Sequence, residues 1–289
     1  MAVSADPAKQ DNTAQIAYWN DRAAVTWTAY QDRIDGMFAA LTVKAVDAAA
    51  PGFGMRVVDV GCGCGATTLE LARRVGPAGR VLGLDVSEPM AARARERIAA
   101  ARLGNAEVLL SDASVHAFEA ASADLLFSRF GVMFFADPAA AFANLRRAVR
   151  PGGRLLLVVW RPMAENAWFS VPLAAADDVL PPAPLPEPDA PGPFALADPD
   201  RVGRILGSAG WSDIGLTRQD VPLCLAGPGQ ITEAAELATR VGALARALAD
   251  AAPELREAAA RSIARVLPAY DGPGGICLSG SVWFVSARS

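Results

Sequence analysis

A glycine-rich stretch carries the residue types most typical of a ligand-binding loop. In VVDVGCGCGATT, residues 57–68, three alternating glycines follow a run of β-forming residues that contains an acid. A glycine loop between a strand and a helix brings backbone N–H groups and the helix start close to a polar ligand group. Read as G-x-G-x-x-A from Gly61, the stretch fits a dinucleotide such as NAD. Read as D-x-G-x-G-x-G from Asp59, it fits a different ligand.

Acidic residues in and after the glycine loop indicate which ligand the loop binds. Asp85 is the last acid of the run RVLGLDV and lies 20 residues beyond Gly65, where a βαβ unit places the acceptor of ribose hydroxyl groups. That position suits both NAD and S-adenosylmethionine. Asp112 lies in LLSDA, where its carboxylate or the next N–H group can read an adenine edge. Asp59 favours S-adenosylmethionine over NAD, because a carboxylate repels the pyrophosphate of NAD but attracts an amino-acid ammonium group.

The elements that position these acids alternate between short β-rich runs and helical segments. Strands that are nearly solidly apolar indicate a parallel sheet covered by helices on both faces. Asp137-Pro138 and Asp198-Pro199 each place a capping acid before a proline, which predicts a helix start. The strands are expected at residues 55–60, 80–86, 106–112, 123–128 and 154–160, the last preceded by a Pro-Gly-Gly turn.

Helical segments are expected outside this core. Periodic apolar residues before residue 50 predict an amphipathic helical arm with room for one break. Two later strands, 213–225 and 281–288, are separated by a block whose heptad-like apolar stripe predicts two helices. This block must bury its stripe against the sheet or a second copy of the chain, so a homodimer through it is one expectation. The proline-rich residues 179–194 predict a surface loop.

Four segments in order, VVDVGCGCG, LDVSEPM, LLSDA and LRRAVRPGGRLLLV, resemble the motifs of class I S-adenosylmethionine-dependent methyltransferases. The resemblance covers roughly residues 55–160 and is to small-molecule enzymes similar to those of ubiquinone and menaquinone biosynthesis. It implies an α/β, Rossmann-like doubly wound sheet of seven strands, mostly parallel with the last antiparallel. The implied division is a helical arm (1–50), a cofactor-binding core (51–225), a helical insertion acting as a lid (226–276) and the last strand (277–289).

The resemblance also implies a role for each matching position toward S-adenosylmethionine. The methyl-transfer product would be S-adenosylhomocysteine. The implied cofactor residues are Asp59 toward the ammonium group, Gly61, Cys62 and Gly63 along the methionine part, Asp85 on the ribose, Val86 and Met90 against the adenine, Asp112 and Ala113 at its amino edge, and Ser128, Arg129 and Phe130 facing the transfer centre.

Some of these residues have simpler interpretations. Asp59 could cap N–H groups of its own loop, and Asp112 could be a helix N-cap. Cys62 and Cys64 fit as small residues in a tight turn, and they lack the second pair of ligands that a metal site needs, so no metal is expected. The four cysteines of the chain do not suggest a disulfide framework.

Aromatic residues point to the kind of acceptor. In an open α/β sheet the ligand lies beyond the carboxyl ends of the strands, where several aromatic groups should meet. They predict an apolar or aromatic small molecule, methylated by direct in-line transfer that depends on orientation and exclusion of water. No catalytic base is assigned, because the single histidine, His116, follows Asp112 and belongs to a loop or helix start. The candidate acceptor residues are Tyr18, Trp19, Trp27, Met133, Phe134, Trp160 and Trp168.

Composition argues against other classes. A net charge of −4 offers no basic surface for nucleic acid. The longest apolar run, LLLVVW, is far shorter than the ~20 residues that span a bilayer, and the first residues lack the apolar core of a signal peptide. A cytoplasmic globular protein is therefore expected. Two alternatives to the methyltransferase stay open: an NAD-dependent oxidoreductase, and a non-catalytic protein that binds S-adenosylmethionine.

Overall fold

The fold is built on one twisted sheet. The computed structural model describes residues 12–180, 190–248 and 251–289. The strand order is β3-β2-β1-β4-β5-β8-β6, with the short β7 paired to β8. β1 to β5 are parallel, whereas β8 runs antiparallel to both β5 and β6. The strands are β1 Arg56–Val60, β2 Arg80–Asp85, β3 Ala106–Leu110, β4 Ala123–Arg129, β5 Val149–Trp160, β6 Ser212–Ala226, β7 Asp271–Gly272 and β8 Gly275–Arg288.

This topology confirms the predicted doubly wound sheet and adds one element. β7 is an eighth, two-residue strand that forms a hairpin with the start of β8. The expected Pro-Gly-Gly turn before the fifth strand is instead part of β5, whose pairing with β4 shifts register near its start. Part of the predicted proline-rich loop, residues 181–189, lies outside the described residues.

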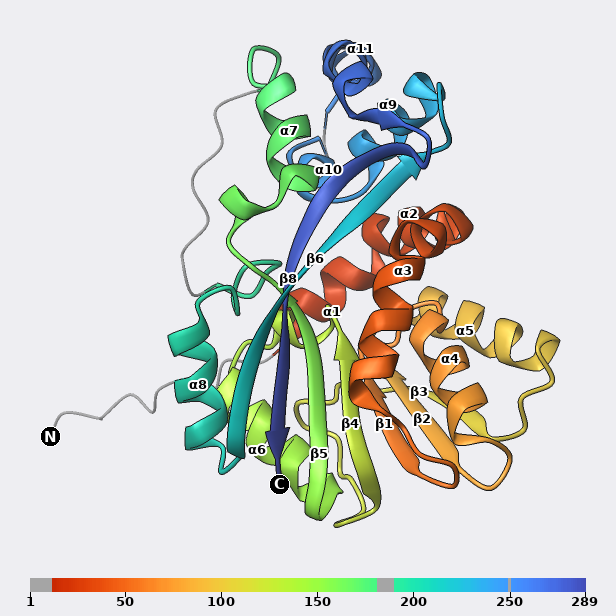
Figure 1. Cartoon of the computed structure of the whole chain (residues 1–289), viewed down its shortest axis with the longest axis vertical. Helices are drawn as coiled ribbons and strands as arrows, with labels where there is room; N and C mark the ends of the chain where they lie inside the picture. The colour runs from red at the N-terminus through yellow and green to blue at the C-terminus, as the bar shows by residue number, and fades with distance from the viewer. Residues whose placement is uncertain (1–11, 181–189, 249–250) are drawn as a thin grey trace, which may run out of the picture.

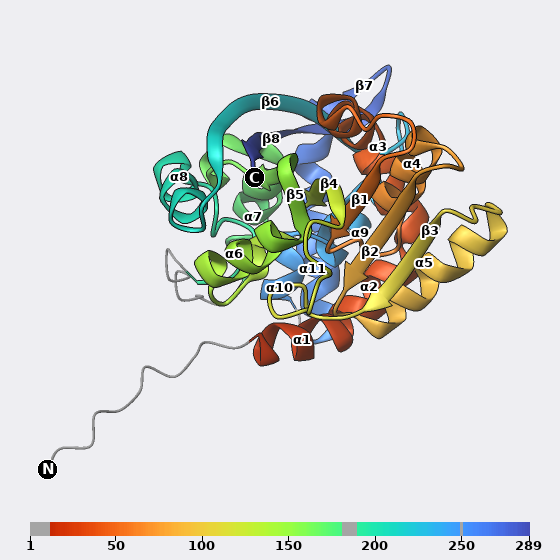
Figure 2. The same cartoon turned by 90° about the horizontal axis from the view of Figure 1, so that it is seen from below.

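Helices cover both faces of the sheet, as the solidly apolar strands require. α3, α4 and α5 contact one face, and α6 and α8 cover the other (Figures 1 and 2). The Asp137 side chain accepts a hydrogen bond from Ala140 N at 3.0 Å, and Asp198 accepts one from Asp200 N at 3.0 Å, which confirms both predicted helix starts. The bounds are α4 Ala66–Val75, α5 Glu88–Ala100, α6 Pro138–Ala148 and α8 Pro199–Ser208.

The N-terminal arm is broken twice, not once. It consists of α1 Thr13–Asn20, α2 Arg22–Ala29 and α3 Gln31–Ala49. Only α3 has the long buried stripe that the periodicity predicts, with Phe38 and Leu41 in the core. α1 contributes no buried residue, so its position depends on polar and aromatic contacts at its ends.

The described residues of the insertion between β6 and β8 form three α-helices where two helices were expected: α9 Ile231–Arg240, α10 Ala243–Ala247 and α11 Pro253–Val266. The extra break falls at Gly242, where a Cβ atom would lie 2.8 Å from the Trp168 ring and where φ is 85°. These helices contact β6 and α7 (Ala167–Ala175), beyond the ends of the parallel strands (Figure 1). Within the described ranges, no helix is both long and apolar enough to cross a bilayer.

A disulfide joins the two strands that carry the insertion, which the sequence analysis did not predict. Cys224 on β6 and Cys277 on β8 are directly paired residues, and their Cα atoms are 3.9 Å apart. The bond closes a loop over a sequence separation of 53 residues that contains the whole insertion. The β6–β8 hairpin is therefore fixed where the insertion leaves and re-enters the sheet.

We expect reduction of this disulfide to lower the melting temperature by on the order of 10 °C, since a loop of this length contributes roughly 4 kcal/mol in the chain-entropy model. Cys224→Ser/Cys277→Ser should melt like the reduced wild type and should not respond to dithiothreitol. Calorimetry with and without reductant is the measurement. Equal melting temperatures for oxidised wild type and the double variant would contradict the prediction.

Candidate cofactor and acceptor site

The glycine loop joins β1 to α4. It is held between β2 and the segment after β4, the two strands that flank β1. Gly61 has φ of 68°, and a Cβ atom there would lie 2.5 Å from Gly131 Cα in the segment after β4. Gly61 N and Cys62 N both donate hydrogen bonds to Leu84 O of β2, at 2.8 and 3.1 Å. The loop thus lies where the strand order reverses between β1 and β4, which is the usual ligand position in such sheets.

Asp59 is fully buried beneath this loop, and only one of its two carboxylate oxygens has hydrogen-bond partners among the described residues. Oδ2 accepts hydrogen bonds from the Thr67 and Thr68 hydroxyl groups, both at 2.7 Å. Oδ1 is buried and has no hydrogen-bond partner among the residues described. Burial raises the Asp59 pKa to about 6, although both threonine hydroxyls and the Arg129 guanidinium oppose this rise. Hydroxyl groups, not N–H groups of the loop, therefore engage Asp59, and an unpaired oxygen is left that suits a cation.

Asp85 connects the glycine loop to the next strand end. Its Oδ2 accepts a hydrogen bond from Gly63 N at 2.7 Å, and its Oδ1 accepts one from Ser87 N at 2.9 Å. Burial raises the pKa of Asp85, and these backbone hydrogen bonds oppose the rise. Met90 is buried on α5, with its Cε 3.0 Å from the position of a Cβ atom on Gly63. Asp85 and Met90 thus both touch the loop, and each carboxylate oxygen keeps acceptor capacity for a ligand.

Asp112 lies in a turn after β3, so the helix N-cap alternative is wrong. Its Oδ1 accepts a hydrogen bond from Ser114 N at 2.9 Å, and both oxygens accept from Asn12 Nδ2. The neighbouring Ala113 is buried. His116 belongs to the same turn, as expected, with Nδ1 2.9 Å from Ser111 Oγ.

The three predicted site residues at the end of β4 point to different partners. The buried Ser128 hydroxyl donates to Val60 O at 2.7 Å. Arg129 donates to the Thr42 hydroxyl on α3, and its guanidinium lies 5.2 Å from the centroid of the Phe38 ring. Burial lowers the pKa of Arg129. Phe130 packs against Phe38, so Arg129 and Phe130 both contact one aromatic group, whereas Ser128 is bound to the end of β1.

The candidate acceptor residues divide into two groups. The outer aromatic cluster consists of Tyr18, Trp19, Trp27 and Phe134. Trp19 is at its centre, with ring centroids 5.3 Å from Tyr18, 5.9 Å from Trp27 and 5.1 Å from Phe134. Met133 is buried next to Phe134 but is not aromatic and lies in the core. The outer cluster attaches the arm to the segment after β4.

The inner aromatic cluster consists of Phe38, Phe130, Trp160, Trp168 and Phe169. Phe130, at φ of 66°, stacks on Trp160 with 4.2 Å between centroids. Trp168 is 4% exposed, and its indole Nε1 has no hydrogen-bond partner in the described chain. Phe38 and Phe169 were missed as site candidates, although Phe38 belongs to the apolar stripe of the arm. Buried N–H groups without a partner are rare in folded proteins, so this one is a candidate donor to a polar ligand atom.

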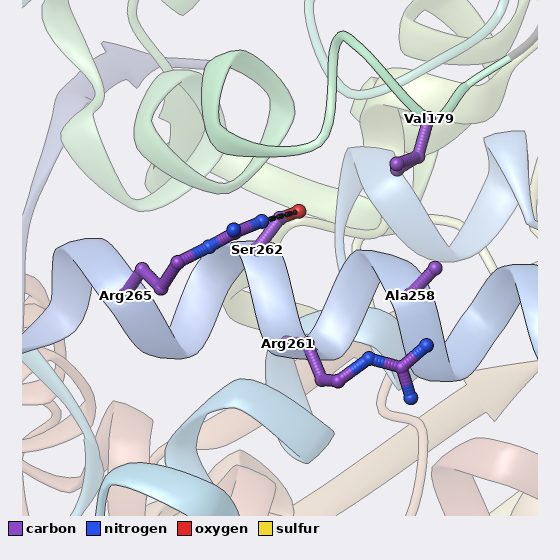
Figure 3. Close-up of a pocket in the computed structure, with 5 residues that line it drawn as sticks. All are labelled: Val179, Ala258, Arg261, Ser262 and Arg265. Atoms are coloured by element: carbon purple, nitrogen blue, oxygen red, sulfur yellow. Dashed lines mark hydrogen bonds between the residues drawn. The ribbon is translucent and has the colours of Figure 1, made fainter.

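A separate cavity of about 390 Å³ lies on the insertion and does not involve these residues. Figure 3 shows its lining on α11 and, across from it, Val179 on another segment; the Arg265 side chain lies along α11 and donates to Ser262 Oγ at 2.7 Å. Arg261 is 69% exposed and pairs with Glu257. Since its lining contains neither the glycine loop nor the three acids, this cavity is not the cofactor site. It is lined by Val179, Ala258, Arg261, Ser262 and Arg265.

Sequence comparison assigns the central part of the chain. Residues 57–153 match a family model described as a methyltransferase domain. The nocamycin O-methyltransferase of Saccharothrix syringae is 34% identical over 164 residues, which are 53% of this chain and 59% of that protein. The aklanonic acid methyltransferase DauC of Streptomyces sp. (strain C5) is 34% identical over 118 residues, 41% of this chain and 54% of that protein. The chain thus spans a little over half the length of these two relatives.

A further relative is similar in sequence, and two solved structures are similar in fold. The demethylmenaquinone methyltransferase of Lactococcus lactis is 32% identical over 105 residues, 36% of this chain and 42% of that protein. Phosphoethanolamine N-methyltransferase 2 of Haemonchus contortus, solved with S-adenosyl-L-methionine, has a TM-score of 0.59 at 17% identity, covering 93% of this chain and 60% of that one. The [4+2]-cyclase SpnF has a TM-score of 0.54 at 20% identity, covering 86% and 80%. Residues 57–153 thus resemble methyltransferase domains in sequence, and the two solved structures share the Rossmann-like fold of this chain.

We expect Asp59→Asn to stabilise the ligand-free protein at neutral pH. The pKa of Asp59 rises from 3.8 to about 6 on folding, so the ionised carboxylate costs about 3 kcal/mol of folded-state stability at pH 7, and this cost disappears as the pH falls from 6 to 4. Asparagine keeps an acceptor for both threonine hydroxyls. Denaturant titration should show the gain at pH 7.5 and little gain at pH 4.

An exposed acid is the control for this measurement. Asp177→Asn alters a side chain at the surface and should change stability by a few tenths of a kcal/mol at most. If Asp59→Asn destabilised the protein at pH 7.5, burial of the ionised Asp59 carboxylate would not lower the stability of the folded state, and the prediction would be wrong.

Proposed function

We propose that the protein transfers the methyl group of S-adenosylmethionine to a small apolar or aromatic acceptor. The observation that carries this proposal is the buried Asp59 with one unpaired oxygen, beneath a glycine loop at the point where the strand order reverses. A dinucleotide would bring its pyrophosphate to such a loop and would be repelled by this carboxylate. The ammonium group of an amino acid would be attracted.

The residues of the glycine loop and the next two strand ends suit the other parts of this cofactor. Asp85 would accept from the ribose hydroxyl groups while it holds Gly63 N, and Val86 and Met90 would pack on the adenine. Asp112, next to the buried Ala113, would accept from the adenine amino group. When bound, the cofactor supplies a methyl group on a sulfonium, which is a good leaving group. The chain then needs to orient the acceptor, which contributes on the order of 7–11 kcal/mol.

The inner aromatic cluster is the best candidate for the acceptor site. Phe130 follows β4, which is next to the strand that carries Asp59, and Trp160 ends β5, the next strand along the sheet. Stacked rings favour a planar or apolar acceptor, and the Trp168 N–H group would donate to an oxygen on it. The relatives named for nocamycin, aklanonic acid and demethylmenaquinone are consistent with small-molecule acceptors. The only histidine is beside Asp112, so transfer would not use a histidine base.

The arm (1–50) and the insertion (226–276) would cover the acceptor and exclude water. The two segments contact each other, because Tyr30 Oη donates to Glu236 Oε1 at 2.9 Å and Arg246 lies over the Tyr18 ring. The insertion also packs on its own β6 and α7, so a homodimer through its stripe stays a prediction. A cytoplasmic location likewise stays a prediction.

Binding and turnover test the proposed function. Isothermal titration with S-adenosylhomocysteine and with NADH should give binding to the first and none to the second. A radiolabelled-methyl screen against aromatic and polyketide-like acceptors, with peptides and polyanions as controls, then measures transfer. Binding without transfer to any small molecule would favour the non-catalytic alternative. Binding of NADH alone would favour the oxidoreductase.

We expect the affinity for S-adenosylhomocysteine to fall below pH 6, by up to about tenfold per pH unit, because its ammonium group requires the ionised form of Asp59. Asp59→Asn should bind weakly at every pH and lose this dependence. Titration calorimetry between pH 5 and 8 is the measurement. An affinity that is unchanged between pH 5 and 7 would argue against contact between Asp59 and the ammonium group.

We expect Trp168→Phe to raise the KM for the acceptor by about tenfold while leaving the affinity for S-adenosylhomocysteine unchanged, since it keeps an aromatic ring but removes a buried donor. Trp211→Phe is the matched control. Its indole donates to Phe142 O at 3.1 Å on the α6 side of the sheet, so it should lose stability without a change in acceptor KM. An unchanged KM for Trp168→Phe would remove Trp168 from the acceptor site.

A further inference from the structure

Two asparagines at the ends of α1 are bound to the segments that the proposed function assigns to the cofactor. Asn20 Nδ2 donates to Val86 O at 2.8 Å, and Asn20 Oδ1 accepts from Glu88 N at 2.9 Å. Both partners lie just beyond Asp85, at the ribose side of the proposed site. Asn12, at the other end of α1, is bound to Asp112 at the adenine side. α1 therefore extends along the cofactor site from one end to the other.

The contacts of Asn12 fix the orientation of its side-chain amide. Oδ1 accepts a hydrogen bond from Ala136 N, after β4, at 2.8 Å. Nδ2 consequently faces the turn after β3, where it lies 3.0 and 3.1 Å from the two oxygens of Asp112 and 3.1 Å from Ser114 Oγ. The amide thus joins the segments that follow β3 and β4, two strands that are consecutive in the chain but separated in the sheet by β2 and β1. It also holds the Asp112 carboxylate in one orientation.

We propose that Asn12 is a positioning residue for recognition of the adenine amino group, acting through Asp112. This inference rests on the proposed use of S-adenosylmethionine. Asp112 Oδ1 accepts from Ser114 N as well as Asn12, whereas Oδ2 accepts only from Asn12 among the described residues, so Oδ2 keeps acceptor capacity. Asn12 and Ser114 together direct that oxygen toward an incoming donor.

The consequence is selectivity between an amino group and a carbonyl group at position 6 of the purine. An amino group donates to the fixed carboxylate, and a carbonyl oxygen in its place would face a negative charge. If Asn12 is removed, the Ser114 N–H group is the remaining partner of Asp112 in the described part of the chain, and the carboxylate can turn. The preference for adenine should then decrease, while the ribose and methionine contacts are kept. A residue that only covers the site would affect both purines equally.

The test compares S-adenosylhomocysteine with S-inosylhomocysteine by isothermal titration, using the full chain. Asn12→Ala should weaken binding of the first about tenfold, the loss expected for a hydrogen bond to a charged group, and change binding of the second by less than about twofold. Asn12→Asp keeps the size of the side chain but places a second carboxylate beside Asp112, so it should reduce selectivity equally or more. Asn105→Ala is the matched control, since Asn105 donates to Ala72 O and Gly76 O, both at 2.8 Å, away from the site.

Each other outcome overturns the inference in a recognisable way. Equal weakening of both ligands by Asn12→Ala would mean that α1 only covers the cofactor. Tighter binding of S-adenosylhomocysteine by Asn12→Ala would mean that Asn12 competes with adenine for Asp112. A loss of selectivity in Asn105→Ala would assign the effect to general destabilisation, which melting temperatures would register. If wild type bound neither ligand, the proposed function itself would fail.

Discussion

The burial of one carboxylate is the constraint on which the arrangement of the site depends. Asp59 lies next to the last residue of β1 with no exposed surface, and only one of its oxygens is satisfied among the described residues. Desolvation of an ionised group is costly, and two threonine hydroxyls offset that cost only in part. The helix that supplies Thr67 and Thr68 begins directly after the glycine loop, so the same short segment shapes the loop and holds the acid. A fold that keeps an unpaired acid here gives up stability for a binding group.

The glycine loop above Asp59 packs closely against the segment after β4, so the position of the loop also fixes the neighbouring strand ends. Gly61 and Gly131 leave no room for a side chain between them, and the glycine loop is tied to β2 through Leu84 O. Asp85 adds a second link through Gly63 N. The loops after β1, β2 and β4 therefore form one connected unit. The conformation of each loop depends on small residues in the others, which explains why glycines and not larger residues occupy these positions.

The sequence allowed prediction of the parts that depend on local patterns. Solidly apolar runs predicted the parallel strands, and the Asp-Pro pairs predicted the starts of α6 and α8, because both patterns act within a few residues. The disulfide between Cys224 and Cys277 could not be predicted, since it depends on strand pairing across 53 residues. The direction of Arg129 toward α3 depends on packing between distant segments. The partners of Asn12 were equally hidden, because an isolated asparagine in a polar N-terminal stretch has no periodic pattern.

The covering of the site comes from parts of the chain that are far apart in sequence. α1 is held by polar contacts to the segments after β2, β3 and β4, and the insertion meets the arm through Tyr30 with Glu236 and Tyr18 with Arg246. Most of these contacts involve exposed or half-buried side chains, which stabilise less than the core contacts of α3. The sheet and the glycine loop are thus held by buried contacts, whereas α1 contributes no buried residue. Access to the proposed cofactor site would therefore depend on α1 more than on any element of the sheet.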